Sequence, residues 1–350
     1  MKEKPTLTYQ LPTKSCLTHT WSKPSFHYLD SVQAGHSRFY NQVKHSSARG
    51  STELLRWLMT RESYTWNVDI QREFDARLNM PAAMPQNRPH ADLDDWQIWF
   101  VGHATVLLQI GPYNLITDPV WCEYASPQQG RGPRRVCPAG IALEHLPTIH
   151  AVLLSHNHYD HMDLATLEWL HKKFAMPIYT GLGNQYYLPK QYHVIEMDWW
   201  QMIPFHDLTI AYTPAQHGSG RGLRDQGKAL WGGFSILGAD DHAFFAGDTG
   251  YSPHFKEIYE RFGAPRIALL PIGAYEPREL MQYVHMNPQD ALHAHLDLHA
   301  QRSVAIHHRT FQLTDEGRDE PERELTHLLK TSSKLVNPFY CLREGHKLTV

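Results

Sequence analysis

The pattern of apolar and polar positions becomes regular near residue 96 and stays regular to the end of the chain. Apolar runs of four to six residues alternate with turns rich in Gly, Pro, Asp and Asn, which is typical of short buried strands. The pattern predicts strands at 97–101, 106–110, 114–117, 151–154, 177–179, 193–197, 208–213, 234–237, 242–246, 267–271 and 303–306. Tight turns separate the first three, so these are expected to form an antiparallel meander.

Three helices are predicted between the strands, each at a residue type that suits a helix start. One follows Asp163, which is expected to be its N-cap. A second opens at Ser252, the expected cap, with Pro in its first turn. A third runs from Asn287 to about residue 300. These three helix starts therefore rest on capping chemistry as well as on the apolar pattern.

The first 95 residues lack this regularity and are expected to form an N-terminal extension and linker before a catalytic domain at 96–350. Residues 1–50 are rich in Pro, Ser, Thr, His and aromatic residues, which predicts an irregular arm that packs on the body or is partly disordered. A short helix is predicted at 51–62, with Ser51 as a candidate cap. Packing on the core is the favoured interpretation of its Trp and Leu side chains, and an interfacial helix facing lipid is the alternative.

Candidate metal ligands follow the strand predicted at 151–154. His156, His158, Asp160 and His161 occur within six residues. With 25 His in 350 residues, any single histidine is better explained as a core or surface residue, but this cluster directly after a buried strand favours a metal site. His156 and His158 can hold one ion, while Asp160 and His161 can turn the other way and hold a second.

Further candidates stand directly after later predicted strands, and strand ends at one edge of a sheet converge. The ligand sets expected are His156, His158 and His217 for one ion, and Asp160, His161 and His307 for the other. Asp248 is expected to bridge the ions, because a carboxylate has two oxygens. Each ion then keeps an open position, which is typical of a catalytic site.

The expected nucleophile is a metal-bound hydroxide. Neither GxSxG nor GxxxxGK[ST] occurs in the chain. Two ions roughly 3.5–4 Å apart lower the pKa of a bridging water, and Asp160 or Asp248 is expected to move its proton. Two zinc ions are the expected cofactors because the ligand set is rich in His, with Fe or Mn as alternatives for mixed His and Asp ligands.

These motifs resemble those of a known family. HxHxDH with the later His, Asp and His is similar to the pattern of the metallo-β-lactamase fold. Longer blocks resemble N-acylphosphatidylethanolamine-hydrolysing phospholipase D and its bacterial relatives, over about residues 96–345. The blocks are GHAT (102–105), TDP (117–119), SHNHYDH (155–161), WW (199–200), FAGDTGY (245–251), PIGAYEPR (271–278) and AIH (305–307).

The resemblance implies an α/β fold, a four-layer αββα sandwich with two mixed sheets face to face and dinuclear zinc at one edge. It implies hydrolysis of N-acylphosphatidylethanolamine to N-acylethanolamine and phosphatidate, and lipid contacts by Tyr159 and His285. One alternative is a hydrolase of the same fold on a soluble substrate, such as a sugar-phosphate lactone or another phosphodiester. A non-catalytic metal-binding protein is the other, against which the intact ligand set argues.

Two departures from the family pattern flank the predicted site. Gly218 follows His217 where the family has Trp, and His308-Arg309 follow His307 where the family has Trp-Gly. Both changes are expected to make the surroundings of the ions more polar and more basic, without altering the metal chemistry.

Composition narrows the expected partners and location. The net charge of −3 and a pI of about 6.8 argue against nucleic acid, although residues 1–80 carry +4. The four cysteines form no CxxC pair and are expected to be reduced thiols. No signal sequence or run of 18 apolar residues is found. We therefore expect a cytoplasmic protein. The phospholipid substrate that the resemblance implies adds peripheral contact with the inner membrane face as an expectation, and a homodimer is left open.

Overall fold

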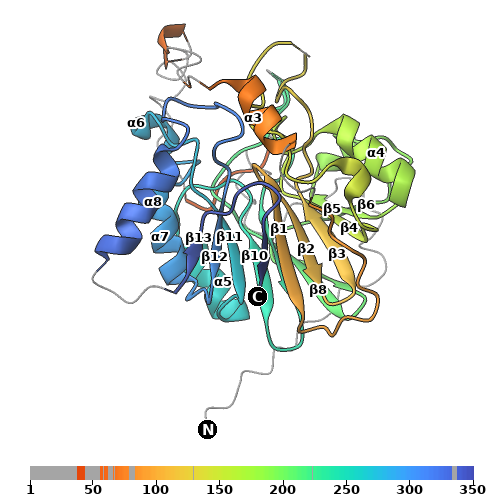
Figure 1. The fold of residues 1–350 in the computed structure, drawn as a ribbon. Helices are drawn as coiled ribbons and strands as arrows, with labels where there is room; N and C mark the ends of the chain where they lie inside the picture. Colours follow the sequence, from red (N-terminus) through yellow and green to blue (C-terminus); the bar gives the residue numbers. More distant parts are fainter. Residues whose placement is uncertain are drawn as a thin grey trace.

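Two sheets of seven strands lie face to face in the computed structural model (Figure 1). The described residues are 38–43, 56–57, 59–61, 66, 68–78, 83–128, 130–222, 224–332 and 337–350. The first sheet has the order β14-β1-β2-β3-β4-β5-β6 and the second β13-β12-β11-β10-β9-β8-β7. Both sheets are mixed, because β1 to β3 and β7 to β10 pair antiparallel while β3 to β6 and β10 to β13 pair parallel.

The strands of the first sheet are short and mostly buried. They are β1 (Trp96–Gly102), β2 (Thr105–Ile110), β3 (Tyr113–Thr117), β4 (Ala151–Leu154), β5 (Ile178–Gly181), β6 (Val194–Met197) and β14 (Lys347–Thr349). Those of the second sheet are β7 (Met202–Phe205), β8 (Leu208–Thr213), β9 (Gly233–Leu237), β10 (His242–Phe245), β11 (Ile267–Pro271), β12 (Ser303–Ile306) and β13 (Phe339–Tyr340).

Helices cover the outer face of each sheet. The α-helices are α3 (Ile70–Leu78), α4 (Leu164–Phe174), α5 (His254–Phe262), α6 (Arg278–Met281), α7 (Pro288–Asp297) and α8 (Glu320–Thr331), with short 3-10 helices at Leu143–His145 and Asn184–Tyr187. Figure 1 shows α4 beside β4 to β6, and α5, α7 and α8 on the opposite side of the molecule. None of the helices in the described part of the chain is both long and apolar enough to cross a membrane.

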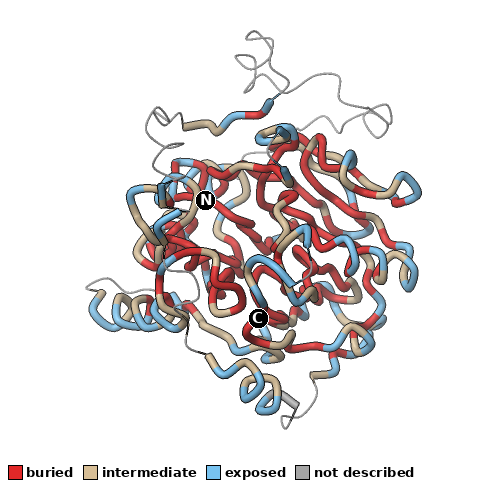
Figure 2. Tube along the Cα trace, turned by 90° about the horizontal axis from the view of Figure 1, so that it is seen from above, coloured by how far each residue is buried: buried red, intermediate tan, exposed pale blue. Residues whose placement is uncertain are grey.

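Three apolar clusters define the layers. The largest lies between the sheets and includes Leu153 from the first and Leu269 from the second, both fully buried. Val152 points the other way and packs with Leu167 of α4, because successive side chains of a strand alternate between its faces. The third cluster joins the second sheet to α5, α7 and α8 through side chains such as Phe255. Figure 2 shows the buried strands inside a rim of more exposed helices and loops. The predicted four-layer αββα sandwich is therefore confirmed.

Most predicted elements are present, but one helix cap is wrong. Asp163 caps α4 by accepting hydrogen bonds from the N–H groups of Ala165 and Thr166, as predicted. Ser252 does not cap α5: its hydroxyl contacts His254 Nδ1 at 2.5 Å, and the helix begins one residue after Pro253. The pattern also predicts nothing at β7, β13, β14, α3 and α8, which are short edge strands or peripheral helices.

The described parts of the N-terminal extension pack on the body. Phe39 is 5% exposed and belongs to the cluster between the sheets. Of the helix predicted at 51–62, residues 56, 57, 59 and 60 are helical, and Ser51 lies outside the described residues. Trp57 Nε1 donates to Asp315 Oδ2 at 2.5 Å, while Met59 is 78% exposed. Among the described cysteines, Cys122, Cys137 and Cys341 are unpaired.

Candidate metal centre

All candidate ligands lie at one edge of the two sheets, where the strands that precede them end. HxHxDH follows β4, and the other candidates come after β8, β10 and β12, so the carboxyl ends of strands from both sheets supply them. The exposed fraction is at most 9% for those classed as buried: His156, Asp160, His161, His217, Asp248 and His307. His158 is half-buried. Residues more than 150 positions apart are thus brought into one cluster.

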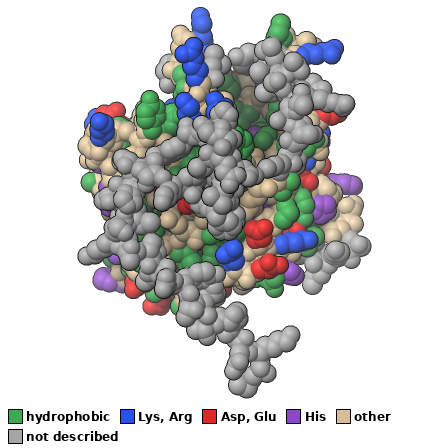
Figure 3. Space-filling model, turned by 180° about the vertical axis from the view of Figure 1, so that it is seen from behind, with side chains coloured by type: hydrophobic (Ala, Val, Ile, Leu, Met, Phe, Trp, Pro, Cys, Tyr) green, Lys and Arg blue, Asp and Glu red, His purple; other side chains and the backbone are tan. Residues whose placement is uncertain are grey.

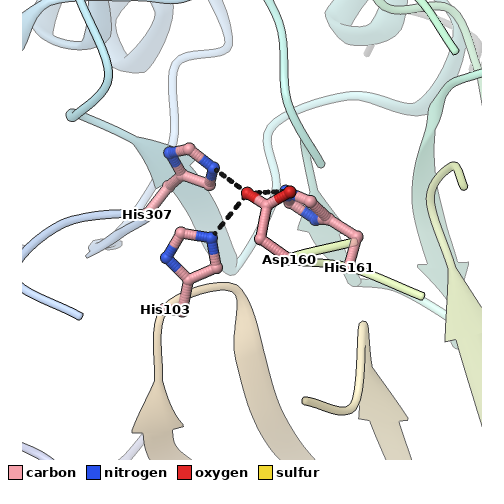
Figure 4. Close-up of side chains that lie close together, drawn as sticks. All are labelled: His103, Asp160, His161 and His307. Atoms are coloured by element: carbon pink, nitrogen blue, oxygen red, sulfur yellow. Dashed lines mark hydrogen bonds and ion pairs between the residues drawn. The ribbon is translucent and has the colours of Figure 1, made fainter. Parts of the chain in front are cut away.

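One group of ligands surrounds two carboxylate oxygens. The Nε2 atoms of His161 and His307 each lie 3.3 Å from Asp160 Oδ2 (Figure 4). Both also lie 3.1 Å from Asp248 Oδ2. Four atoms bound tetrahedrally to zinc at 2.0–2.2 Å are about 3.3–3.6 Å apart. The side chains are therefore placed as one ion requires.

A second group consists of three imidazoles. His158 Nδ1 lies 2.8 Å from His156 Nε2 and 3.2 Å from His217 Nε2. His217 Nε2 is also 3.8 Å from Asp248 Oδ2. Asp248 Oδ2 consequently stands between the two groups, where a bridging ligand would be needed. Among the described residues, its other oxygen, Oδ1, is buried without a hydrogen-bond partner.

The two groups have opposite proton affinities. Burial lowers the pKa of His158 and of His217 to about 4, so both imidazoles are neutral at pH 7 and can bind a cation. Burial also disfavours charge on His307, but Asp248 and Asp160 outweigh it and raise its pKa to about 9. The pKa of His161 is raised in the same way, and protons on these two rings occupy the place of a cation between two carboxylates.

Hydrogen bonds outside the ligand groups orient the imidazoles. His161 Nδ1 lies 2.6 Å from Asp118 Oδ2, which also accepts from Ser155 Oγ at 2.5 Å. Ser155 Oγ in turn is 2.9 Å from His156 Nδ1, and His217 Nδ1 is 2.9 Å from the carbonyl oxygen of Val284. Each contact leaves Nε2 of the ring free for an ion, as partners behind metal-bound histidines do.

His103 also lies at the centre, although the sequence pattern assigns no role to it beyond its place in the block GHAT (102–105). His103 Nε2 lies 3.0 Å from Asp160 Oδ2, and its ring centroid is 4.2 Å from that of His307. His103 sits in the tight turn between β1 and β2 at a positive φ of 56°, and its carbonyl oxygen accepts from His307 N at 2.9 Å. Its place at the end of β1, on the edge where the ligands gather, is the signal that could have identified it.

The two residues expected to contact lipid have different surroundings. His285 Nδ1 is buried 3.9 Å from Asp248 Oδ2 and therefore faces the centre, and it has no hydrogen-bond partner within the part of the chain that the structure describes. The hydroxyl of Tyr159 donates to the carbonyl oxygen of Arg221 at 2.8 Å, and the guanidinium carbon of Arg221 lies 3.9 Å from the centroid of the Tyr159 ring. Tyr159 thus offers its ring rather than a free hydroxyl.

At His308-Arg309 the departure from the family pattern does not make the site more basic, which corrects that part of the expectation. Burial lowers the pKa of His308 to about 3, so its ring is neutral. The Arg309 guanidinium forms ion pairs with Asp319 and Glu322 of the α8 region. Next to Gly218, the main-chain N–H of Gly220 donates to Asn157 Oδ1 at 2.7 Å, which supports the HxHxDH loop.

Comparisons with known proteins agree with this geometry. A family model described as "Beta-lactamase superfamily domain" matches residues 113–308. An uncharacterized Mycobacterium tuberculosis protein, Rv0906, is 38% identical over 234 residues, 65% of this chain and 62% of that protein. The chain thus matches less than two thirds of that relative's length. A Caenorhabditis elegans protein named N-acyl-phosphatidylethanolamine-hydrolyzing phospholipase D 1 is 34% identical over 260 residues, 70% of this chain and 73% of that protein.

A solved structure supports the fold independently. The structure of a possible metal-dependent hydrolase from Veillonella parvula matches with a TM-score of 0.58 and 16% identity, over 74% of this chain and all of that chain. The family model covers more than half of the chain, and the worm protein is similar over most of both sequences. This protein therefore belongs to the beta-lactamase superfamily, and it has the metallo-β-lactamase fold of metal-dependent hydrolases.

Proposed function

We propose that this protein is a dinuclear metallohydrolase of the phospholipase D type, which hydrolyses N-acylphosphatidylethanolamine to N-acylethanolamine and phosphatidate. The observation that carries the proposal is the position of Asp248 Oδ2, 3.1 Å from His161 and His307 and 3.8 Å from His217. A carboxylate placed between two ligand groups can join two ions. The worm relative named for this reaction supports the choice of substrate.

The chemistry of the ligand set suits two zinc ions. Five of them are imidazole nitrogens, which suit zinc well, and Fe or Mn are the alternatives for a set that also contains two carboxylates. Two bound ions would supply an activated water and would neutralise the charge that develops on the phosphoryl oxygens.

Two carboxylates and His285 are assigned roles towards the attacking water and the phosphoryl group. Asp160 and Asp248 are positioned to take the proton of the attacking water, and no described residue hydrogen-bonds to Asp248 Oδ1, which is therefore an available acceptor. His285 Nδ1, 3.9 Å from Asp248 Oδ2, can hydrogen-bond a phosphoryl oxygen of the substrate beside the ions. The ring of Tyr159, fixed by Arg221, forms a wall for the remainder of the lipid.

A phospholipid substrate requires contact with a membrane or micelle surface. Figure 3 shows Lys and Arg side chains beside hydrophobic ones at the upper end of that face. Basic and apolar side chains together suit an anionic lipid surface. We accordingly propose peripheral binding to the inner face of the membrane by a cytoplasmic protein.

The test is hydrolysis of N-acylphosphatidylethanolamine in detergent micelles by zinc-loaded protein, in water enriched in ¹⁸O. Attack at phosphorus puts the label into phosphatidate and leaves N-acylethanolamine unlabelled, and mass spectrometry distinguishes the two. Asp160→Asn is expected to reduce the rate at least about 100-fold, because it removes a ligand and a proton acceptor. Asp94→Asn, at an exposed turn, is the matched control and should keep full activity.

Three outcomes would contradict the proposal. Label in N-acylethanolamine would mean attack at carbon. Full activity of the Asp160→Asn protein would mean that the metal assignment is wrong. Absence of product from protein that holds two zinc ions would redirect the search to soluble phosphodiesters and sugar-phosphate lactones, and rapid hydrolysis of one of these would favour the alternative substrate class.

A further inference from the structure

One side chain of the N-terminal extension reaches the candidate metal centre. Asn41 Nδ2 donates to the carbonyl oxygen of His217 at 2.7 Å, and Asn41 Oδ1 accepts from His217 N at 2.9 Å. Trp231 Nε1 donates to the same Oδ1 at 2.9 Å. The Asn41 amide thus uses one N–H donor and both acceptor positions of its oxygen. It hydrogen-bonds to the peptide groups on both sides of the His217 Cα.

His217 depends on this contact because no strand holds its main chain. β8 ends at Thr213 and β9 begins at Gly233, so His217 lies in the connection between them. Among the described residues, Asn41 supplies both main-chain hydrogen bonds of His217. By contrast, the main-chain N–H of His307 donates to His103 O, within the predicted catalytic domain.

Neighbouring contacts of the same segment support the docking of Asn41. Gln216 Nε2 donates to the carbonyl oxygen of Val43 at 2.9 Å, and Phe39 N donates to the carbonyl oxygen of Gly227 at 2.7 Å. Phe39 itself is 5% exposed and packs into the cluster between the sheets. Residues 39–43 are therefore held at several points along the connection that carries His217.

We propose that Asn41 is a positioning residue for the three-histidine site formed by His156, His158 and His217. The inference rests on the proposed function for the presence of an ion there. A metal–nitrogen bond tolerates about ±0.2 Å, so freedom in the main chain of His217 moves its Nε2 out of range. Loss of a supporting hydrogen bond behind a metal ligand typically lowers metal affinity 10- to 100-fold.

The experiment compares full-length wild-type protein with Asn41→Ala, Asn41→Asp and Gln216→Ala. Asn41→Asp keeps the shape and the acceptors but cannot donate to His217 O, so it tests the amide donor even if the alanine variant does not fold. Gln216→Ala removes the contact with Val43 and leaves the main chain of His217 tied to Asn41. Each protein is loaded with zinc and dialysed against graded concentrations of chelator. Zinc per chain is measured by mass spectrometry, and folding by circular dichroism.

Wild-type protein and Gln216→Ala are expected to hold two zinc ions. Both Asn41 variants should lose one ion at a free-zinc concentration 10- to 100-fold higher than wild type and keep the other. The role of Asn41 is overturned if both variants retain the second ion as tightly as wild type, or if Gln216→Ala loses it equally. Wild-type protein with fewer than two ions would instead overturn the dinuclear centre itself, which separates the two failures.

Discussion

Asp118 links the two ligand groups, and replacing its carboxylate by an amide is expected to weaken both ion sites unequally. Its Oδ1 accepts from Ser155 N at 2.7 Å, while its Oδ2 is 2.6 Å from His161 Nδ1 and 2.5 Å from Ser155 Oγ. In Asp118→Asn, the amide oxygen can face only one side. If the amide oxygen still accepts the hydrogen bond from Ser155 N, the amide NH₂ faces two other hydrogen-bond donors. These are the hydroxyl of Ser155 and the N–H of His161.

The magnitude follows from these contacts. To relieve the conflict, His161 must carry its proton on Nε2, the atom that faces Asp160 and Asp248, and that proton blocks metal binding. Losing a partner behind a metal ligand costs 10- to 100-fold in affinity, or about 1.4–2.7 kcal/mol. We expect about 100-fold at the site of His161. At the three-histidine site, linked only through the 2.9 Å contact of Ser155 Oγ with His156, about tenfold or less is expected.

The assay is competition for zinc with a chromophoric chelator, at a protein concentration that resolves two successive affinities. Cobalt(II) spectra of the same proteins assign each affinity, because a site with three imidazoles and a site with two carboxylates absorb differently. Ser155→Ala is the matched control, expected to weaken only the three-histidine site. Wild-type zinc affinities in Asp118→Asn, with an unchanged unfolding temperature, would refute the reasoning.

Two further predictions concern stability. In metal-free protein, the folded-state pKa of His307 is about 9 because carboxylates outweigh burial, so its stabilisation is complete below pH 6.5 and is lost as pH rises towards 9. The pKa of His158 and of His217 is about 4 because of burial, so their contribution is lost as pH falls from 6.5 towards 4. Thermal unfolding should therefore show a maximum near neutral pH, and zinc should reduce the alkaline loss; apo-protein that gains stability from pH 7 to 9 would contradict the His307 part. Asp163→Ala should lower the free energy of unfolding by about 1–2 kcal/mol, since this carboxylate accepts from main-chain N–H groups of α4 and of residues 121–122. Urea denaturation measures it, and an unchanged midpoint would contradict the capping role.

Short-range patterns predicted much of the fold. In 151–154, four consecutive apolar residues predict a strand buried on both faces, and β4 contributes to the clusters on both sides of its sheet. Edge strands were missed because β13 and β14 have two and three residues, too few for a pattern. Ser252 was wrongly predicted as a cap because a local preference cannot show that its hydroxyl has a competing partner in His254.

The candidate ligands were found because each stands directly after a strand that the sequence marks clearly. Of the supporting residues, Asn41 has no such signal, whereas His103 and Asp118 also follow predicted strands but have partners far along the chain. The hydrogen-bonded partners are far apart in the sequence. Asp118 and His161 are separated by 43 positions, His103 and Asp160 by 57, and Asn41 and His217 by 176. Asp, His and Asn are common at turns and surfaces for local reasons, so their residue types alone indicate no role at the centre.

By itself, then, the sequence determined which side chains are candidates to bind ions and which strands they follow, because strand periodicity and ligand chemistry are local properties. Only the tertiary structure decided how these side chains are oriented. Hydrogen bonds from Asp118, His103 and Asn41 depend on distances below about 3 Å between segments far apart in the chain. Such distances arise only when the two sheets pack and the N-terminal extension docks on them, since no local rule relates residues so widely separated.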